Sequence, residues 1–311
     1  MSYLLTGASG FLGKEFLKSL NTVSSVDSLG RSDDNDIIVD LSSQVPSLEK
    51  NYIVVVHAAG KAHMVPKSSI EKDEFFKVNH KGTCNLLQAL EKSETLPKSF
   101  IYISSVAVYG STGGILLGED TPLNATDPYG KSKIMAEESV LEWGDKCNVR
   151  IGILRLPLIA GAHPPGNLNN MLKAQLGGYY FQIGGGKARK SMVSAIDVAH
   201  IIPKLAVTGG IFNLTDQYHP SFAELAHLFS KKLKVKSPYN MPLVLAQLLA
   251  TVGDIIGKVS KKDARFNSNT LSKMTNSLTF SDAKAKEVLS WQPRHVLDVF
   301  ESLPEGELIY D

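Results

Sequence analysis

The sequence predicts an α/β protein in which a doubly wound parallel sheet carries a smaller, interwoven C-terminal domain. Three observations predict this class. Short apolar runs alternate with helix-period stretches through the first half, a glycine-rich turn directly follows the first run, and proline and glycine interrupt the chain after Arg155. Strands that alternate with helices form parallel sheets with right-handed crossovers, and such sheets bind ligands at the carboxyl ends of their strands.

Six apolar runs in the first half have the length of buried strands, and helical periodicity appears between several of them. The expected strands are Tyr3–Leu5, Val26–Leu29, Ile37–Val39, Ile53–Val56, Phe100–Ile103 and Val149–Leu154, and the expected helices are Lys14–Leu20, Phe75–Glu91 and Ser132–Trp143.

The turn after the first run has the pattern of a loop that binds a dinucleotide. The first glycine permits a tight turn, the second lets backbone approach a pyrophosphate, and the third lets the following helix pack close to the sheet. The helix N-terminus then presents free N–H groups to the phosphates. An ordinary strand-to-helix turn is the alternative. The predicted cofactor loop comprises Gly7, Ser9, Gly10, Phe11, Leu12 and Gly13.

The second half of the chain is expected to contribute one further strand to the sheet and to form most of a smaller domain. Ile211–Leu214 is expected to be a further strand of the sheet, and 221–233 a helix with Ser221 as N-cap and Glu224 completing a capping box. Residues 242–258 predict a buried or dimer-facing helix. We expect residues 1–161 plus about 191–215 to form a dinucleotide-binding Rossmann domain, and residues 162–190 plus 216–311 to form the smaller substrate domain.

Composition narrows the functional class. The chain has 311 residues, a net charge of +2 and two cysteines, Cys84 and Cys147. This charge argues for neither nucleic acid nor anionic membrane as a partner. Two cysteines without a signal sequence predict reduced thiols and a cytoplasmic protein. No metal site is predicted, and the basic run 231–236 is expected to solvate a helix end.

Tyr129 and Lys133 form the second group with chemical meaning. Pro128 and Gly130 mark the start of a helix, so these two side chains lie four residues apart on one face. A nearby ammonium favours the phenolate and lowers the pKa of a tyrosine toward the range of acid–base catalysis. A half-exposed pair on an amphipathic helix is the alternative, because the spacing is common by chance.

A strand ending in Ser104-Ser105 strengthens the catalytic interpretation. A hydroxyl at the carboxyl end of a parallel strand faces the ligand crevice, where it can bond a carbonyl or alkoxide oxygen while Tyr129 exchanges the proton.

Together these motifs resemble an extended short-chain dehydrogenase/reductase of the NAD(P)-dependent epimerase/dehydratase family, in its UDP-sugar 4-epimerase-like and 4-keto-sugar reductase branches. The similarity covers nearly the whole length. Its stretches are TGASGFLG (6–13), VVHAAG (55–60), VNHKGTCNLL (78–87), YISSVAVYG (102–110), PYGKSKIMAE (128–137), GILRLPLIAG (152–161), GGGKARKSMVSAIDVA (184–199) and VLSWQP (288–293).

The resemblance implies specific roles. It makes Ser105, rather than Ser104, the serine of a catalytic triad with Tyr129 and Lys133, and gives Asn79 a structural role. Lys133 would also bind the cofactor ribose, and Ser105 the substrate. Further cofactor contacts would come from Asp40, Leu41, His57, Ala58, Ala59, Gly60 and Leu156, and substrate contacts from Lys61, His63, Asn167 and Arg189.

Cofactor choice depends on the end of the second strand. NAD-binding proteins usually place a carboxylate there, whereas this chain has Gly30 followed by Arg31. A guanidinium can bind a 2′-phosphate with two hydrogen bonds, so NADP(H) is favoured. Asp33 or Asp34 would still allow NAD(H), and Arg31 as a solvated loop residue is the alternative.

The resemblance also bears on the reaction. Dehydratases of the family carry an acidic pair after the triad serine, where this chain has Val106-Ala107. The expected reaction is therefore oxidation or reduction at C4 of a nucleotide-diphosphate sugar, with a UDP-sugar favoured, by a 4-epimerase or a 4-keto-sugar reductase. A non-catalytic NADP-sensing regulatory protein is the alternative. By analogy, a homodimer is expected to pair through 75–91 and 132–143.

Overall fold

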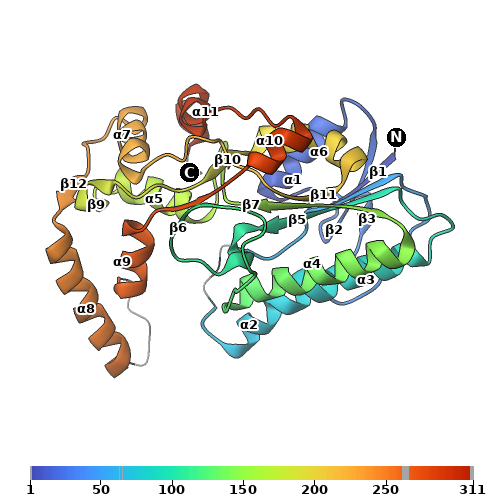
Figure 1. Cartoon of the computed structure of the whole chain (residues 1–311), viewed down its shortest axis with the longest axis horizontal. Helices are drawn as coiled ribbons and strands as arrows, with labels where there is room; N and C mark the ends of the chain where they lie inside the picture. Colours follow the sequence, from blue (N-terminus) through green and yellow to red (C-terminus); the bar gives the residue numbers. More distant parts are fainter. Residues whose placement is uncertain (1, 63, 65, 261–265, 309–311) are drawn as a thin grey trace.

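Seven parallel strands form the central sheet of the computed structural model, which describes residues 2–62, 64, 66–260 and 266–308 (Figure 1). Their order across the sheet is β3-β2-β1-β4-β5-β7-β11. The first five of these positions follow the Rossmann order, so the predicted fold class is confirmed. The strand bounds are β1 Ser2–Thr6, β2 Ser25–Gly30, β3 Ile37–Ile38, β4 Val54–His57, β5 Ser99–Ser105, β7 Arg150–Leu156 and β11 Gly210–Asn213.

Helices cover both faces of this sheet, as Figure 1 shows. One core lies between the sheet and helices α1 (Phe11–Leu20) and α6 (Ala195–Thr208). The second core lies between the opposite face and helices α3 (Gly82–Glu91) and α4 (Pro128–Cys147). Because both faces are covered, the middle of each central strand is apolar on both sides, which explains the continuous hydrophobic runs of the sequence.

The predicted helix 75–91 is longer and less regular than expected. Helix α2 (Ser69–Phe75) begins where the Ser68 hydroxyl accepts a hydrogen bond from Glu71 N. A π-helical turn, Phe76–Lys81, then joins it to α3. Such turns insert an extra residue and occur often at functional sites. Here the turn contains the buried Asn79.

The C-terminal part combines helices with three two-stranded sheets. Strand β8 (Leu158–Ala160) pairs with β10 (Met192–Ser194), β9 (Phe181–Ile183) with β12 (Tyr239–Met241), and β6 (Gly114–Leu117) with β13 (Leu278–Phe280). The helices are α5 Gly166–Leu176, α7 Phe222–Leu233, α8 Leu243–Ser260, α9 Ser268–Thr275, α10 Ala283–Leu289 and α11 Val296–Ser302, and short 3-10 turns lie at Val106–Tyr109, Gly184–Gly186 and Glu305–Glu307.

Two expectations for this part have different outcomes. The capping box of Ser221 and Glu224 at the start of α7 is confirmed. Residues 242–258 were expected to form a buried or dimer-facing helix, and the helix is present as α8. Most of its large apolar side chains face outward, so it is not buried within the chain, and the dimer-facing alternative stays a prediction. In Figure 1 this helix projects from the body beside α9. Its hydrophobic sequence therefore does not reflect burial within the chain.

Candidate functional site

The glycine-rich turn joins β1 to α1 in the closely packed form that a dinucleotide loop requires. Gly7 has φ +76°, and a Cβ there would lie 2.6 Å from Ala59 N. A Cβ on Gly13 would lie 1.9 Å from Gly7 O, so the helix can approach the turn only without a side chain. Gly10 caps α1 without a side-chain hydrogen bond. The first N–H groups of the helix are thus left for an anion.

A cavity of about 660 Å³ opens in front of this turn, at the carboxyl ends of β1, β2 and β4. Its volume lies in the range of small-molecule and cofactor sites. The predicted cofactor residues that line it are Gly7, Ser9, Gly10, Arg31, Asp40, Leu41, His57, Ala58, Ala59 and Gly60. The residues present therefore fit a dinucleotide.

Other predicted cofactor residues lie behind the cavity wall. The side chains of Leu12 and Leu156 are buried in the core between the sheet and α1, and Phe11 packs against the same core. Gly13 contacts Gly7 rather than the cavity. These positions shape the turn and the strand end, while their side chains do not line the space.

The imidazole of His57 is held between two threonines. Thr6 Oγ1 lies 2.6 Å from Nδ1, and Thr83 Oγ1 lies 2.9 Å from Nε2. Because the Thr83 hydroxyl donates to Asn79 O, it accepts from Nε2–H, and Nδ1 accepts from Thr6. Burial, reinforced by the Lys133 charge, lowers the pKa of His57 to about 3. The ring is therefore neutral and structural, and it fixes the backbone of 57–60 against the cavity.

Tyr129 lies in the first turn of α4, where local sequence fixes the helix start. The Asp127 carboxylate accepts a hydrogen bond of 3.0 Å from Gly130 N, and Pro128 occupies the first turn. The ring of Phe75 packs edge-on to Tyr129 at 6.0 Å. Burial raises the pKa of Tyr129, while a hydrogen bond with Ser105 opposes the rise. This direction differs from the lowering expected from Lys133, because desolvation of the phenol dominates.

The two serines at the end of β5 have different partners. The Ser104 hydroxyl donates to the Glu137 carboxylate and is buried. Ser105 is partly exposed and interacts with the Tyr129 phenol. The geometry therefore places Ser105, not Ser104, beside the candidate acid–base group.

Lys133, one helical turn after Tyr129 on α4, reaches the cavity wall. Its ammonium donates to Ile103 O at 2.8 Å and lies 4.6 Å from the centre of the Tyr102 ring. A Cβ on Gly60, in the cavity wall, would lie 3.3 Å from Nζ. Burial lowers the pKa of Lys133 to about 8. The Lys133 ammonium thus extends from α4, the helix that also carries Tyr129, to the wall of the cofactor cavity.

Asn79 connects the cavity wall to α4 from its π-helical turn. Its Oδ1 accepts from Lys61 N at 2.7 Å, and its Nδ2 donates to Lys61 O and to Ser132 Oγ at 3.1 and 2.9 Å. The Ser132 hydroxyl in turn donates to Tyr129 O at 2.7 Å. One amide thereby holds the loop after β4 at a fixed distance from α4.

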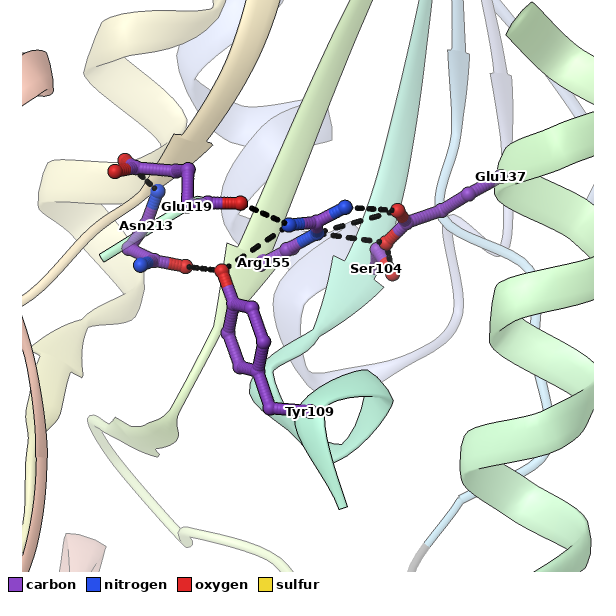
Figure 2. Close-up of polar contacts among 6 residues, drawn as sticks. All are labelled: Ser104, Tyr109, Glu119, Glu137, Arg155 and Asn213. Carbon is purple, nitrogen blue, oxygen red and sulfur yellow. Dashed lines mark hydrogen bonds and ion pairs between the residues drawn. The ribbon is translucent and has the colours of Figure 1, made fainter. Parts of the chain in front are cut away.

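Figure 2 shows a buried polar network that connects β5, β7, β11 and α4, which the sequence did not predict. Its centre is Arg155 on β7, which binds both oxygens of Glu137 on α4, with a shortest distance of 2.7 Å. Arg155 also donates to Tyr109 Oη at 3.1 Å and to Glu119 O at 3.2 Å. The Tyr109 hydroxyl donates to Asn213 Oδ1 at 2.8 Å, on β11.

This network joins the elements on which the site is built. Glu137 follows Lys133 by one helical turn and accepts from Ser104, the neighbour of Ser105. Its carboxylate therefore fixes α4 relative to the end of β5. Two signals for it were present in the sequence: an acidic residue on the Tyr129/Lys133 face, and an arginine near the carboxyl end of a strand whose middle is apolar.

The predicted substrate residues are dispersed. Lys61 lines the cavity and pairs with Glu74, and His63 lies outside the described residues. Asn167 is exposed near the start of α5. Arg189 donates to His219 O at 2.9 Å and lies 3.5 Å from the Glu224 carboxylate. Neither Asn167 nor Arg189 lines the cofactor cavity.

Arg31 is exposed at the cavity edge, at the end of β2. The pKa of the Asp40 carboxylate is lowered chiefly by hydrogen bonding to Ser42, and the positive charge of Arg31 lowers it further. The two predicted cofactor residues Arg31 and Asp40 thus lie close enough to interact across the same end of the cavity.

Comparisons with known proteins agree with this arrangement. Residues 3–214 match the model of the NAD dependent epimerase/dehydratase family. An N-acetyl-alpha-D-glucosaminyl-diphospho-ditrans,octacis-undecaprenol 4-epimerase of Escherichia coli O157:H7 is 28% identical over 90% of this chain and 87% of its own. A UDP-glucose 4-epimerase of Vibrio cholerae is 27% identical over 95% of this chain and 92% of its own.

Solved structures share the fold. The Bacillus cereus UDP-glucuronic acid 4-epimerase, solved with UDP-glucuronic acid and NAD, has a TM-score of 0.74 at 18% identity and covers 99% of both chains. A human epimerase family protein solved with NADPH has a TM-score of 0.71 at 18% identity, covering 97% of this chain and 100% of its own. The predicted resemblance is confirmed: this chain is an enzyme of the NAD dependent epimerase/dehydratase family.

Proposed function

We propose that the chain oxidises and reduces C4 of a sugar joined through a diphosphate to a nucleoside, as a 4-epimerase or a 4-keto-sugar reductase. The observation that supports this proposal has two parts: the Lys133 ammonium reaches Gly60 in the wall of a cavity that fits a dinucleotide, and Ser105 interacts with the phenol of Tyr129, one helical turn before Lys133 on α4. Relatives over most of the chain, named as 4-epimerases of diphosphate-linked sugars, support the choice of C4 and of the diphosphate.

Each member of the triad has a role that follows from its surroundings. Tyr129 exchanges the proton of the C4 hydroxyl, and Ser105 bonds the same sugar oxygen and orients it. The Lys133 ammonium favours the tyrosinate once Tyr129 has lost its proton. When bound, the nicotinamide cofactor accepts and returns the hydride that leaves C4. Gly7, Gly10 and the free N-terminus of α1 would hold its diphosphate.

Replacement of the phenol tests the acid–base role. We expect Tyr129→Phe to lower kcat by about 10²–10⁴-fold, because the proton of the sugar hydroxyl loses its acceptor. Dinucleotide affinity, measured by calorimetry, should stay unchanged. Tyr179→Phe, at an exposed position outside the site, is the matched control. Equal turnover in Tyr129→Phe and in the wild type would contradict the assignment.

Substrate assays separate the remaining alternatives. A 4-epimerase interconverts UDP-sugars without net use of cofactor, whereas a 4-keto-sugar reductase consumes NADPH with a UDP-4-keto-6-deoxy-hexosamine. Val106-Ala107 after the triad serine supply no acid for a dehydratase.

A regulatory protein would bind the dinucleotide and turn over neither substrate. The filled triad positions favour the enzyme.

For the cofactor we propose NADP(H), with NAD(H) as the alternative. The support is the exposed Arg31 guanidinium at the cavity edge, which can bind a 2′-phosphate with two hydrogen bonds. We expect Arg31→Ala to weaken NADPH binding at least tenfold and to leave NADH binding unchanged. Arg31→Lys keeps the positive charge but lacks the planar guanidinium that forms two hydrogen bonds. Its NADPH affinity should therefore lie between that of the wild type and that of Arg31→Ala. An unchanged NADPH preference in Arg31→Ala would contradict the proposal.

Three further expectations remain predictions. They are the division into 1–161 plus about 191–215 and 162–190 plus 216–311, the homodimer through 75–91 and 132–143, and the substrate contacts of Lys61, Asn167 and Arg189. A measured native mass of twice 33.8 kDa would support the dimer.

A further inference from the structure

Helix α8 presents a row of large apolar side chains to solvent. Among residues 243–257 and 260, whose side chains the structure describes, the buried ones are small and lie on one side: Ala246, Ala250 and Gly253. The helix packs against α9. Eight larger side chains remain between 43% and 68% exposed: Leu243, Val244, Leu245, Leu248, Leu249, Val252, Ile255 and Ile256. Exposed apolar area of this extent marks an interaction surface.

These side chains form one face. At about 100° per residue, the seven from Val244 to Ile256 fall within an arc of about 140°, away from the side packed on α9. The charged residue Asp254 lies outside this arc and hydrogen-bonds Ser268 at the start of α9. The outward face is therefore uncharged along four turns of helix.

Two exposed aromatic side chains lie on the two-stranded sheet that directly precedes the helix. Tyr239 on β12 pairs with Phe181 on β9, and neighbours in a parallel register point to the same side of the sheet. They are 73% and 44% exposed. Tyrosine and phenylalanine at the end of an apolar surface are typical of groups that lie at a membrane–water interface.

The charge of the surrounding sequence is strongly positive. Residues 231–273 contain nine Lys and Arg and two Asp, a net +7, whereas the whole chain carries +2 and the remainder therefore −5. An apolar helix within a cationic segment is complementary to an anionic lipid surface. The small net charge of the whole chain is therefore the sum of a strongly positive segment and a negative remainder.

We propose that α8, with Tyr239 and Phe181, docks the protein on an anionic phospholipid surface. No helix in the described part of the chain is long and apolar enough to cross a membrane, so α8 would lie in the interface. A second copy of the chain fits this face less well. A two-fold interface would bring the same net +7 segment of both copies together, which costs electrostatic energy.

The consequence for substrate rests on the proposed function. One relative acts, by its name, on a sugar diphosphate joined to undecaprenol rather than to a nucleoside. An enzyme held at the bilayer by α8 would meet sugars carried on such lipid diphosphates. The docking surface thus extends the proposed substrate class from nucleotide-linked to lipid-linked sugar diphosphates.

Vesicle flotation with the full chain tests the docking. We expect binding to vesicles of phosphatidylcholine with phosphatidylglycerol, weaker binding at high salt, and little binding to phosphatidylcholine alone. The triple variant Leu248→Ser/Val252→Ser/Ile255→Ser should bind at least tenfold more weakly. Ile70→Ser/Ile115→Ser/Val207→Ser, which alters equally exposed side chains elsewhere, is the matched control and should bind like the wild type.

Two measurements distinguish a failure of the membrane docking from a failure of the proposed function. Turnover of a soluble UDP-sugar should be equal in the wild type and both triple variants, which also shows that they fold. Wild-type protein that turns over the sugar but does not float would overturn the docking alone. A lower native mass of the α8 variant by light scattering, with vesicle binding unchanged, would assign the face to a second copy instead.

Discussion

Burial acts in opposite directions on the two titratable groups of the candidate triad. It lowers the pKa of the Lys133 ammonium to about 8 and raises that of the Tyr129 phenol. The lysine still carries its charge near neutral pH, and its bond to Ile103 O keeps it fixed at the cavity wall. In the proposed reaction, Ser105, whose hydrogen bond opposes the rise in the pKa of the phenol, would act alongside Lys133 to make proton exchange accessible.

At the same scale, His57 predicts a pH dependence of stability. Its pKa is about 3 in the folded state and 6.5 as the ordinary value, so the unfolded chain binds a proton between these pH values and the folded protein does not. The contribution of the neutral His57 imidazole to the free energy of unfolding is fully present above pH 6.5 and is lost as the pH falls toward 3. We expect the free energy of unfolding of the wild type to fall, relative to His57→Asn, by about 1.4 kcal/mol per pH unit in this window.

Urea unfolding of both proteins at several pH values measures this difference. Asparagine keeps polar groups for Thr6 and Thr83 but does not titrate, so it is the conservative replacement. Parallel pH profiles for the two proteins would show that the imidazole gains its proton without cost in the folded state.

At the scale of elements, the sequence predicted what depends on neighbours along the chain. The start of α4 follows from Asp127 and Pro128, and the shared face of Tyr129 and Lys133 follows from helical spacing. The π-helical turn at 76–81 was not predicted, because its hydrogen-bond register leaves no mark in the pattern of apolar residues. The partner of Glu137 was also missed, since Arg155 reaches it from another strand.

The same network explains how separate elements hold the site together. Breaking a buried ion pair leaves an uncompensated charge, so Glu137 and Arg155 depend on each other. Their contacts reach β5 through Ser104 and β11 through Tyr109 and Asn213. The strand ends that carry Ser105 and the helix that carries Tyr129 are consequently fixed by one set of bonds.

At the scale of the whole molecule, sequence patterning predicted the sheet but not how the C-terminal part is joined to it. Ala285, Leu289 and Trp291 pack in the core beneath α1 and α6, although the predicted boundary assigned 216–311 to the smaller domain. Arg294 binds Asp197 at the start of α6 at 2.7 Å. Such long-range contacts depend on chain topology, which local periodicity does not encode. Whether α8 is covered by this chain was open in the sequence for a related reason, because the hydrophobicity of a helix does not say what covers its apolar face.

These contacts predict that the C-terminal segment unfolds together with the sheet. The two tryptophans report on this separately: Trp143 packs on the α4 side, and Trp291 on the opposite side, with its Nε1 bonded to Thr215 O at 2.9 Å. In Trp143→Phe, which retains only Trp291, the fluorescence and far-UV circular dichroism transitions in urea should coincide. Trp291→Phe provides the converse measurement. Loss of the Trp291 signal at lower urea than the circular dichroism change would mean that the segment detaches first, as an independent domain would.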